Sequence, residues 1–263
     1  MSKIRAIILD WAGTTVDFGC FAPMDAFAAA FRAFGVEPSV EETRAPMGLA
    51  KRAHIERMLA GVRLSALWRE RHGREHTAED IDGVYARFES ALSEALGKHA
   101  APLPGALAAV GRLREAGVAI GSTTGYTRAM MDVVAPLAEK WGYAPDCLVC
   151  PDETGGLGRP YPYMLWRNLE NLGIRSISEA VKVGDTDADM REGRNAGCLT
   201  VGVLKGSSMM GIDEAQYLAL SAEEREARFA AARRRYEAAG ADYVLEDITG
   251  LPALIEKLNG GKP

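Results

Sequence analysis

The chain has 263 residues, of which 48% are hydrophobic, 25% charged and 7% aromatic, a composition typical of globular proteins that excludes a disordered, fibrous or membrane-embedded chain. Thirty-one Lys and Arg residues face 36 Asp and Glu residues, and the net charge of -5 disfavours binding to nucleic acids or anionic membranes but not to a small anionic substrate. Because no apolar run approaches the roughly 20 residues of a membrane-spanning helix, we expect a cytoplasmic protein.

Short apolar runs recur along the chain and predict the strands of a sheet. The first, Ala6–Leu9, does not alternate between apolar and polar residues, as expected of a parallel strand buried on both faces. Amphipathic helical patterns separate most of these runs, and this alternation predicts an α/β fold with a doubly wound, mostly parallel sheet. The other predicted strands are residues 118–120, 147–150, 180–183, 199–203 and 243–245, and the helices between them are residues 106–116, 129–140, 163–172 and 190–196.

A stretch without predicted strands interrupts this alternation. Between about residues 20 and 99 only helical patterns occur, at 24–34, 49–59 and 78–96. The segment Pro-Leu-Pro-Gly at 102–105 then marks the return to the sheet. The sequence therefore predicts an α/β core domain of residues 1–19 and 100–263 and an inserted all-helical cap domain of residues 20–99.

Two features allow a second interpretation. Cys147 and Cys150 have the CxxC spacing of metal and redox sites, but their apolar surroundings contain no second cysteine pair or nearby His, which favours buried thiols. The arginine-rich segment 223–239 could contact nucleic acid, but its mixed charges are typical of a solvated surface helix. We expect neither feature to carry the function.

Polar residues follow several predicted strands, at the edge of the sheet where ligands bind in open α/β folds. Asp10 and Asp185 come from different strand ends and supply the hard oxygen ligands that Mg²⁺ prefers. Thr124 stands near a helix start and suits a tetrahedral oxyanion, while Arg159 supplies a fixed positive charge. The predicted chemistry is phosphoryl transfer, with Asp10 as a nucleophile that forms an aspartyl phosphate.

The order of these motifs resembles that of the haloacid dehalogenase superfamily. An aspartate follows strand one, a Ser/Thr follows strand two, a basic residue precedes a helix, and a Gly-Asp-x3-Asp segment ends at Asp189. The resemblance spans most of the chain and implies a Rossmann-like core with a helical cap. Two positions depart from it: Ala12 stands where phosphatases of the superfamily have an acidic Asp that protonates the leaving group, and Arg159 stands where Lys is usual.

The absence of that acid at position 12 favours a carbon leaving group, whose electrons need an acceptor rather than a proton. A lysine that condenses with a substrate aldehyde gives a protonated imine, which can accept the electron pair of a breaking phosphorus–carbon bond. Lys51 in the cap is the candidate, because Ala12 leaves it space. His54 shares a helix face with Lys51 and is expected either to shuttle protons during imine formation or to be a hydrogen-bonded histidine at the cap interface.

The segments 10–17 (Asp-Trp-Ala-Gly-Thr-Thr-Val-Asp), 47–51 (Met-Gly-Leu-Ala-Lys) and 121–126 (Gly-Ser-Thr-Thr-Gly-Tyr) resemble those of the phosphonoacetaldehyde hydrolase family within this superfamily. The resemblance implies hydrolysis of phosphonoacetaldehyde to acetaldehyde and phosphate, in aminoethylphosphonate degradation, by a Mg²⁺-dependent homodimer joined through its caps. It further implies that Asp10 is the nucleophile and Lys51 the imine-forming base. Asp10, the Ala12 carbonyl and Asp185 would bind the metal with support from Asp189, and Thr124 and Arg159 would hold the phosphoryl oxygens beside Ala12.

Two other functions fit the same scaffold. A phosphomonoester phosphatase or sugar-phosphate mutase would need another acid in place of Ala12. A catalytically silent phosphate sensor would not need the full set of carboxylates together with Thr124 and Arg159.

Overall fold

A computed structural model describes residues 3–96 and 99–260. Its sheet has six strands, all parallel, in the order β3-β2-β1-β4-β5-β6. The predicted doubly wound α/β fold is therefore confirmed. The second strand runs to Thr123, further than the apolar run indicated, because Ser122 and Thr123 are buried polar residues within it. The strands are β1 (Ala6–Leu9), β2 (Ala119–Thr123), β3 (Cys147–Val149), β4 (Ala180–Gly184), β5 (Leu199–Val203) and β6 (Tyr243–Leu245).

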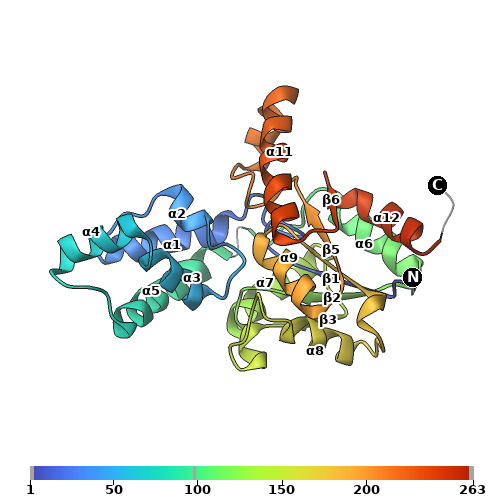
Figure 1. Cartoon of the computed structure of the whole chain (residues 1–263), viewed down its shortest axis with the longest axis horizontal. Helices are drawn as coiled ribbons and strands as arrows, with labels where there is room; N and C mark the ends of the chain where they lie inside the picture. Colours follow the sequence, from blue (N-terminus) through green and yellow to red (C-terminus); the bar gives the residue numbers. More distant parts are fainter. Residues whose placement is uncertain (1–2, 97–98, 261–263) are drawn as a thin grey trace.

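Helices cover both faces of the sheet (Figure 1). Ile7 and Leu9 of β1 belong to one apolar cluster and Ile8 to another, because successive side chains of a strand point to opposite faces. This double burial explains the unalternated apolar runs of the sequence. The first face is covered by α6 (Ala106–Glu115), α7 (Arg128–Lys140) and α12 (Leu251–Leu258), and the second by α8 (Tyr163–Asn171), α9 (Asp187–Ala196) and α11 (Ala222–Ala239).

Among the described residues between β1 and α6, five helices form a group that lies beside the sheet, away from α6 and α12 (Figure 1). We call this group the cap. Its long helices α1 and α5 pack against each other, and α3 packs against α5. The sequence patterns did not predict the short helix α2 or helix α4, in which only Leu64 and Trp68 are buried. The cap helices are α1 (Phe21–Ala33), α2 (Val40–Arg44), α3 (Lys51–Leu59), α4 (Val62–His72) and α5 (Ala78–Leu96).

Other parts of the chain can also be compared with the sequence-based expectations. Helix α9 begins three residues earlier than predicted because Thr186 and Asp189 form a capping box at its start. The surface helix expected at 223–239 is present as α11. All four cysteines are free; three are buried, whereas Cys147 is only half-buried. Within the described part of the chain, no helix is long and apolar enough to cross a membrane. The other helical segments are α10 (Glu214–Ala219), Pro151–Thr154, Ile177–Glu179 and Ile248–Gly250.

Candidate active site

The strand register brings three predicted site residues to one edge of the sheet. Leu9, the last residue of β1, lies between Ser122 of β2 and Val183 of β4. The residues that follow these three strands, Asp10, Thr124 and Asp185, therefore meet at the carboxyl ends of the strands, which is where open α/β sheets bind their ligands. All three residues are buried.

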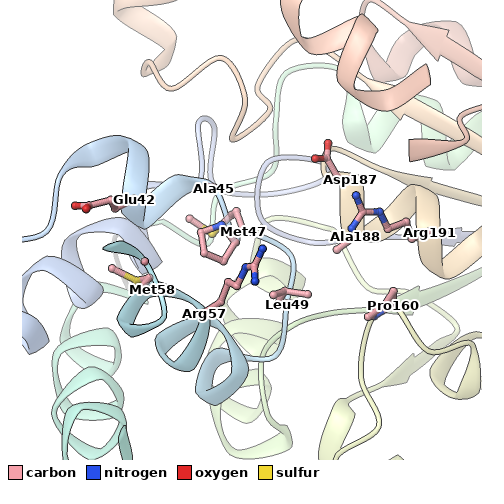
Figure 2. Close-up of a pocket in the computed structure, with 12 residues that line it drawn as sticks. Glu42, Ala45, Met47, Leu49, Arg57, Met58, Pro160, Asp187, Ala188 and Arg191 are labelled. Carbon is pink, nitrogen blue, oxygen red and sulfur yellow. The ribbon is translucent and has the colours of Figure 1, made fainter. Parts of the chain in front are cut away.

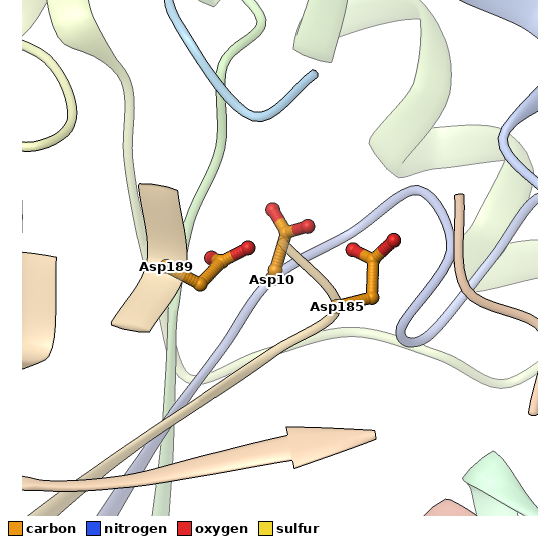
Figure 3. Close-up of side chains that lie close together, drawn as sticks. All are labelled: Asp10, Asp185 and Asp189. Carbon is orange, nitrogen blue, oxygen red and sulfur yellow. The ribbon is translucent and has the colours of Figure 1, made fainter. Parts of the chain in front are cut away.

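Three buried carboxylates form a group that fits a divalent cation. Oxygens of Asp10, Asp185 and Asp189 all lie within 4.8 Å of one another, with Asp10 between the other two (Figure 3). Burial raises the pKa of Asp185 well above its usual range, and the charges of Asp10 and Asp189 add to this effect. A bound cation would offset this repulsion. Oxygen ligands of this kind suit Mg²⁺, and no other such group occurs within residues 3–96 and 99–260.

The two flanking carboxylates are held by different partners. Asp185 accepts hydrogen bonds of 2.7 Å from both the backbone N–H and the hydroxyl of Ser208. Asp189 Oδ1 lies 3.0 Å from Arg159 and 2.9 Å from the Nζ of Lys182. Asp189 thus already has two cationic partners, which fits the predicted supporting position better than that of a principal metal ligand.

Arg159 is a fixed cation beside the predicted nucleophile. Its side chain is only 1% exposed, and Nη2 lies 2.6 Å from Asp10 Oδ1 and donates a 2.7 Å hydrogen bond to the carbonyl of Thr123. Burial alone would lower the pKa of Arg159, but the carboxylates of Asp10, Asp189 and Glu192 outweigh it and raise the pKa. The guanidinium therefore stays charged where a phosphoryl group would meet Asp10.

A second buried cation lies behind this pair, and sequence reasoning missed it. Lys182 of β4 is fully buried, and its Nζ lies 2.9 Å from Asp189, 3.1 Å from Glu192 and 2.7 Å from the Thr123 hydroxyl. We interpreted its surroundings in the sequence only as an apolar strand. The signal was present, because a lysine in a strand buried on both faces needs charged or polar partners.

Lys51 approaches the strand ends from the cap. It is the first residue of α3 and 6% exposed, and its Nζ lies 4.8 Å from the ring centroid of Tyr126 and 5.9 Å from that of Phe27. Burial lowers the pKa of Lys51 from its ordinary value, and the charge of Arg159 contributes in the same direction, against the opposing effects of Cys20 and Asp10. The shift is toward the neutral amine, which is the form that can attack an aldehyde.

One cavity joins Lys51 to Asp10. The space between the atoms that line it amounts to about 280 Å³, counting the part open to solvent. Three other predicted site residues, Ala12, Thr124 and Arg159, also line this cavity, whereas Asp185 and Asp189 do not. Sequence reasoning did not place Cys20 here, because nothing in its local pattern marks it, whereas Tyr126 ends the segment 121–126 that resembles the family. The lining residues are Asp10, Ala12, Cys20, Met47, Gly48, Lys51, Thr124, Gly125, Tyr126, Arg159 and Thr186.

His54 is not among the lining residues. It is fully buried, stacks on Phe27 at 3.9 Å between ring centroids, and its Nε2 lies 2.8 Å from the carbonyl of Thr43. Nε2 must be the protonated nitrogen, since a carbonyl only accepts, and Nδ1 has no hydrogen-bond partner among the described residues. Burial lowers the pKa of His54 well below 6.5. A proton-transfer role stays a prediction, and it would fall to Nδ1.

Glycines allow the cap to pack directly on the core beside this cavity. Gly48 has φ +89°, and a β-carbon there would overlap the hydroxyl of Thr186 on the core. A β-carbon at Gly125 would lie 2.7 Å from the carbonyl oxygen of Leu49. The cap loop that precedes Lys51 therefore rests on the core with no room for side chains at these two positions.

Comparison with known proteins agrees with this geometry. A family model described as haloacid dehalogenase-like hydrolase matches residues 4–197, and a second, HAD-hydrolase-like model matches residues 156–251. The first match covers most of the chain. The chain belongs to the haloacid dehalogenase-like hydrolases.

Similar proteins within that family share a narrower name. A phosphonoacetaldehyde hydrolase from Lysinibacillus sphaericus is 48% identical over 257 residues, which cover 98% of this chain and 96% of that protein. A bifunctional phosphonoacetaldehyde hydrolase/aminoethylphosphonate transaminase from Clostridioides difficile is 43% identical over 97% of this chain and 40% of that protein. The crystal structure of a phosphonoacetaldehyde hydrolase-like protein from Oleispira antarctica aligns with a TM-score of 0.94 at 34% identity, covering 100% of this chain and 96% of that one. The predicted resemblance to phosphonoacetaldehyde hydrolases is confirmed.

Proposed function

We propose that this chain hydrolyses the carbon–phosphorus bond of phosphonoacetaldehyde, giving acetaldehyde and phosphate. The names of the similar proteins support this substrate. The single observation that carries the mechanism is that a buried lysine and the carboxylate proposed as nucleophile line the same cavity, Lys51 from the cap and Asp10 from the core.

The first step is imine formation. The neutral amine of Lys51 adds to the aldehyde carbon, and loss of water leaves a protonated imine. The rings of Tyr126 and Phe27 lie within cation–π distance of Nζ and so favour its positive form once the bond has formed. Ala12 leaves room for the aldehyde where a phosphatase would place its acid.

The second step breaks the carbon–phosphorus bond. An oxygen of Asp10 attacks phosphorus, and the electron pair of the breaking bond moves to carbon to form an enamine, with the imine nitrogen as the final electron acceptor. Arg159 holds the attacking carboxylate and stays cationic, and the buried hydroxyl of Thr124 lies at the same strand ends to bind a phosphoryl oxygen. An aspartyl phosphate remains on Asp10.

Two hydrolytic steps restore the enzyme. The enamine takes a proton on carbon, and water then releases acetaldehyde from Lys51. A second water cleaves the acyl phosphate on Asp10 and releases phosphate. The sum is one substrate and one water converted to acetaldehyde and phosphate, which balances the reaction.

Asp10, the Ala12 carbonyl and Asp185, supported by Asp189, would hold Mg²⁺ in this reaction. The three carboxylates fit the ion because they are buried, close together and mutually repulsive. When bound, the ion supplies positive charge against which the phosphonate and Asp10 can approach each other. The chain's own residues keep the roles given above.

The place in metabolism is also part of the proposal. The relative from Clostridioides difficile combines in one chain the hydrolase and an aminoethylphosphonate transaminase. This pairing supports a role for the present chain in aminoethylphosphonate degradation, where a transaminase would supply the aldehyde. The homodimer joined through the caps and the cytoplasmic location stay predictions.

Borohydride trapping tests the proposal. Incubation with phosphonoacetaldehyde, Mg²⁺ and borohydride reduces an imine to a stable amine, and peptide mass spectrometry then locates the added mass. We expect the adduct on Lys51 and its loss in Lys51→Arg, since a guanidinium keeps the charge but cannot form the imine. Lys140→Arg, an exposed lysine at the end of α7, is the matched control. Near-normal acetaldehyde release by Lys51→Arg would overturn the imine mechanism and favour an ordinary phosphatase.

A further inference from the structure

A second, larger cleft opens next to the catalytic cavity, between the cap and the core (Figure 2). It measures about 970 Å³, counting the part open to solvent. Met47 lines both spaces. Two further lining residues, Pro160 and Asp187, directly follow Arg159 and Thr186 of the catalytic cavity. The cleft therefore lies directly beside the cavity in which the proposed reaction would take place.

Four charged side chains line this cleft, and among them only the two acidic ones form ion pairs. The acidic ones are neutralised: Glu42 lies 2.9 Å from Arg63, and Asp187 lies 2.8 Å from Arg235. The basic ones, Arg57 and Arg191, are exposed and have no ion pair or hydrogen bond with any described residue.

The cleft thus has two uncompensated positive charges in a chain whose net charge is -5. A local field of this sign in a cleft attracts anions, even when the whole molecule is acidic. Exposed, unpaired arginines elsewhere on the surface would have less effect on the reaction, because Arg57 and Arg191 line the cleft beside the catalytic cavity.

The two arginines come from opposite walls. Arg57 lies on α3, the cap helix that begins with Lys51, and Arg191 lies on α9, the core helix that contains Asp189. In Figure 2 both side chains extend into the space between the cap and the core. An anion in this cleft would meet one guanidinium from each side. Arginine suits phosphonate and phosphate oxygens because its planar donors match their geometry.

We propose that Arg57 and Arg191 form an outer binding site for small phosphonate and phosphate dianions, which captures the substrate before it enters the catalytic cavity. The identity of the substrate rests on the proposed function, whereas the anion site itself rests on the charges of the cleft. The attraction acts over a distance, so it increases the rate of productive encounter rather than the rate of bond cleavage.

Charge-removing variants test this proposal. Arg57→Gln, Arg191→Gln and the double variant keep a polar side chain but remove the charge. At low ionic strength we expect kcat/KM for phosphonoacetaldehyde to fall about threefold in each single variant and about tenfold in the double variant, with the loss in KM rather than kcat. At about 1 M salt, where the screening length is about 3 Å, the difference from the wild type should nearly vanish. Arg112→Gln is the control, since Arg112 is also exposed and lies on α6, away from the cap.

Direct binding of inorganic phosphate gives a second measurement that needs no cleavage. By calorimetry at low ionic strength, the double variant should bind phosphate more weakly than the wild type, and Arg112→Gln should bind it equally well. Unchanged kcat/KM and phosphate affinity in the double variant, or an equal loss in Arg112→Gln, would overturn the outer site. A wild type that releases no acetaldehyde would instead overturn the proposed function, and the phosphate titration would still decide the role of the arginines.

Discussion

Lys51 is a residue whose chemistry is set by its position rather than by its type. An exposed lysine is almost fully protonated at neutral pH and is a poor nucleophile. Here burial in the first turn of α3 removes the water that would stabilise the ammonium, and this effect outweighs the opposing charges of Cys20 and Asp10. The same residue on the outer face of α3 would be an ordinary solvated side chain, so the proposed imine chemistry depends on the packing of the cap against the core.

This position predicts a pH dependence for imine formation. Protonated Lys51 cannot add to an aldehyde, so the reaction is lost as pH falls through the pKa of Lys51 in the folded protein. Because burial lowers that pKa, we expect the midpoint of imine formation to lie below the ordinary lysine value of 10.5. The initial rate of the borohydride-trapped adduct on Lys51 as a function of pH measures it, with adducts on Lys140 in the same digest as the reference. A midpoint on Lys51 equal to that on Lys140 would contradict the effect of burial.

At the scale of elements, the cap loop before Lys51 packs on the core beside the cavity. A β-carbon on Gly48, which has φ +89°, would overlap the hydroxyl of Thr186, whereas a β-carbon on Gly73, also in the cap and with φ +70°, would meet no atom within 4 Å. An alanine at either position would be strained by the positive φ, but only an alanine at Gly48 would also collide with the core. Comparing the two variants therefore separates the effect of disturbed packing between cap and core from the effect of backbone strain.

We expect Gly48→Ala to lower kcat/KM by about tenfold or more, because a misplacement of about 1 Å at the reacting groups has effects of that order. Gly73→Ala should leave kcat/KM nearly unchanged and lower stability only by the strain of a positive φ, about 1 kcal/mol. Steady-state kinetics and urea unfolding of both variants check this. Equal losses of activity in the two variants would show that strain, not the contact with Thr186, is responsible.

The buried charges between β4 and α9 form a second inter-element contact. Lys182 forms ion pairs with Asp189 and Glu192, and all three side chains are fully buried, so water cannot take the place of the lysine. We expect Lys182→Met to destabilise the fold by about 3–5 kcal/mol, since removing one partner leaves uncompensated buried charge. Glu75→Gln breaks the exposed ion pair with Arg69 and should change stability by less than about 1 kcal/mol. Urea unfolding compares the two, and a similar small change in both would refute the importance of the buried network.

The elements themselves were largely predictable from local pattern. Apolar runs located all six strands because a parallel strand buried on both faces needs apolar residues at every position. Helix α4 escaped prediction because only Leu64 and Trp68 bury themselves, and Val62 at its start is 90% exposed. A helix that presents so little apolar surface leaves no periodic signal in the sequence.

Site residues that belong to a sequence motif were predictable, whereas residues that reach the site only through tertiary packing were not. Asp10, Thr124 and Asp185 follow strands, so the topology of the sheet places them together. Cys20 directly precedes the first cap helix, α1, and lines the cavity outside the segments that resemble the family. Its position depends on tertiary packing, for which the residue carries no sequence signal.

At the scale of the whole molecule, folding brings three carboxylates that repel one another together at the carboxyl ends of the strands. Asp10 follows β1, whereas Asp185 and Asp189 lie four residues apart after β4, so two distant segments of the chain bring the three carboxylates together. Burial together with the neighbouring carboxylates disfavours the charged form of Asp185. A cation that binds here stabilises only the folded chain, because unfolding separates its ligands. Metal binding should therefore be visible as a change in the stability of the entire protein.

We expect Mg²⁺ to raise the melting temperature of the wild type by several degrees, since ligand at about 100 times its Kd contributes about 2.7 kcal/mol and each kcal/mol shifts a chain of this size by about 2–4 °C. Asp185→Asn should lose this shift, yet melt at or above the wild-type temperature without metal, because the variant removes a disfavoured buried charge while Asn keeps an acceptor for Ser208. Asp132→Asn, which removes an exposed carboxylate on α7, should keep the full shift. Scanning calorimetry with Mg²⁺ and with a chelator measures all three proteins. A Mg²⁺ shift that survives in Asp185→Asn would place the bound ion elsewhere in the molecule.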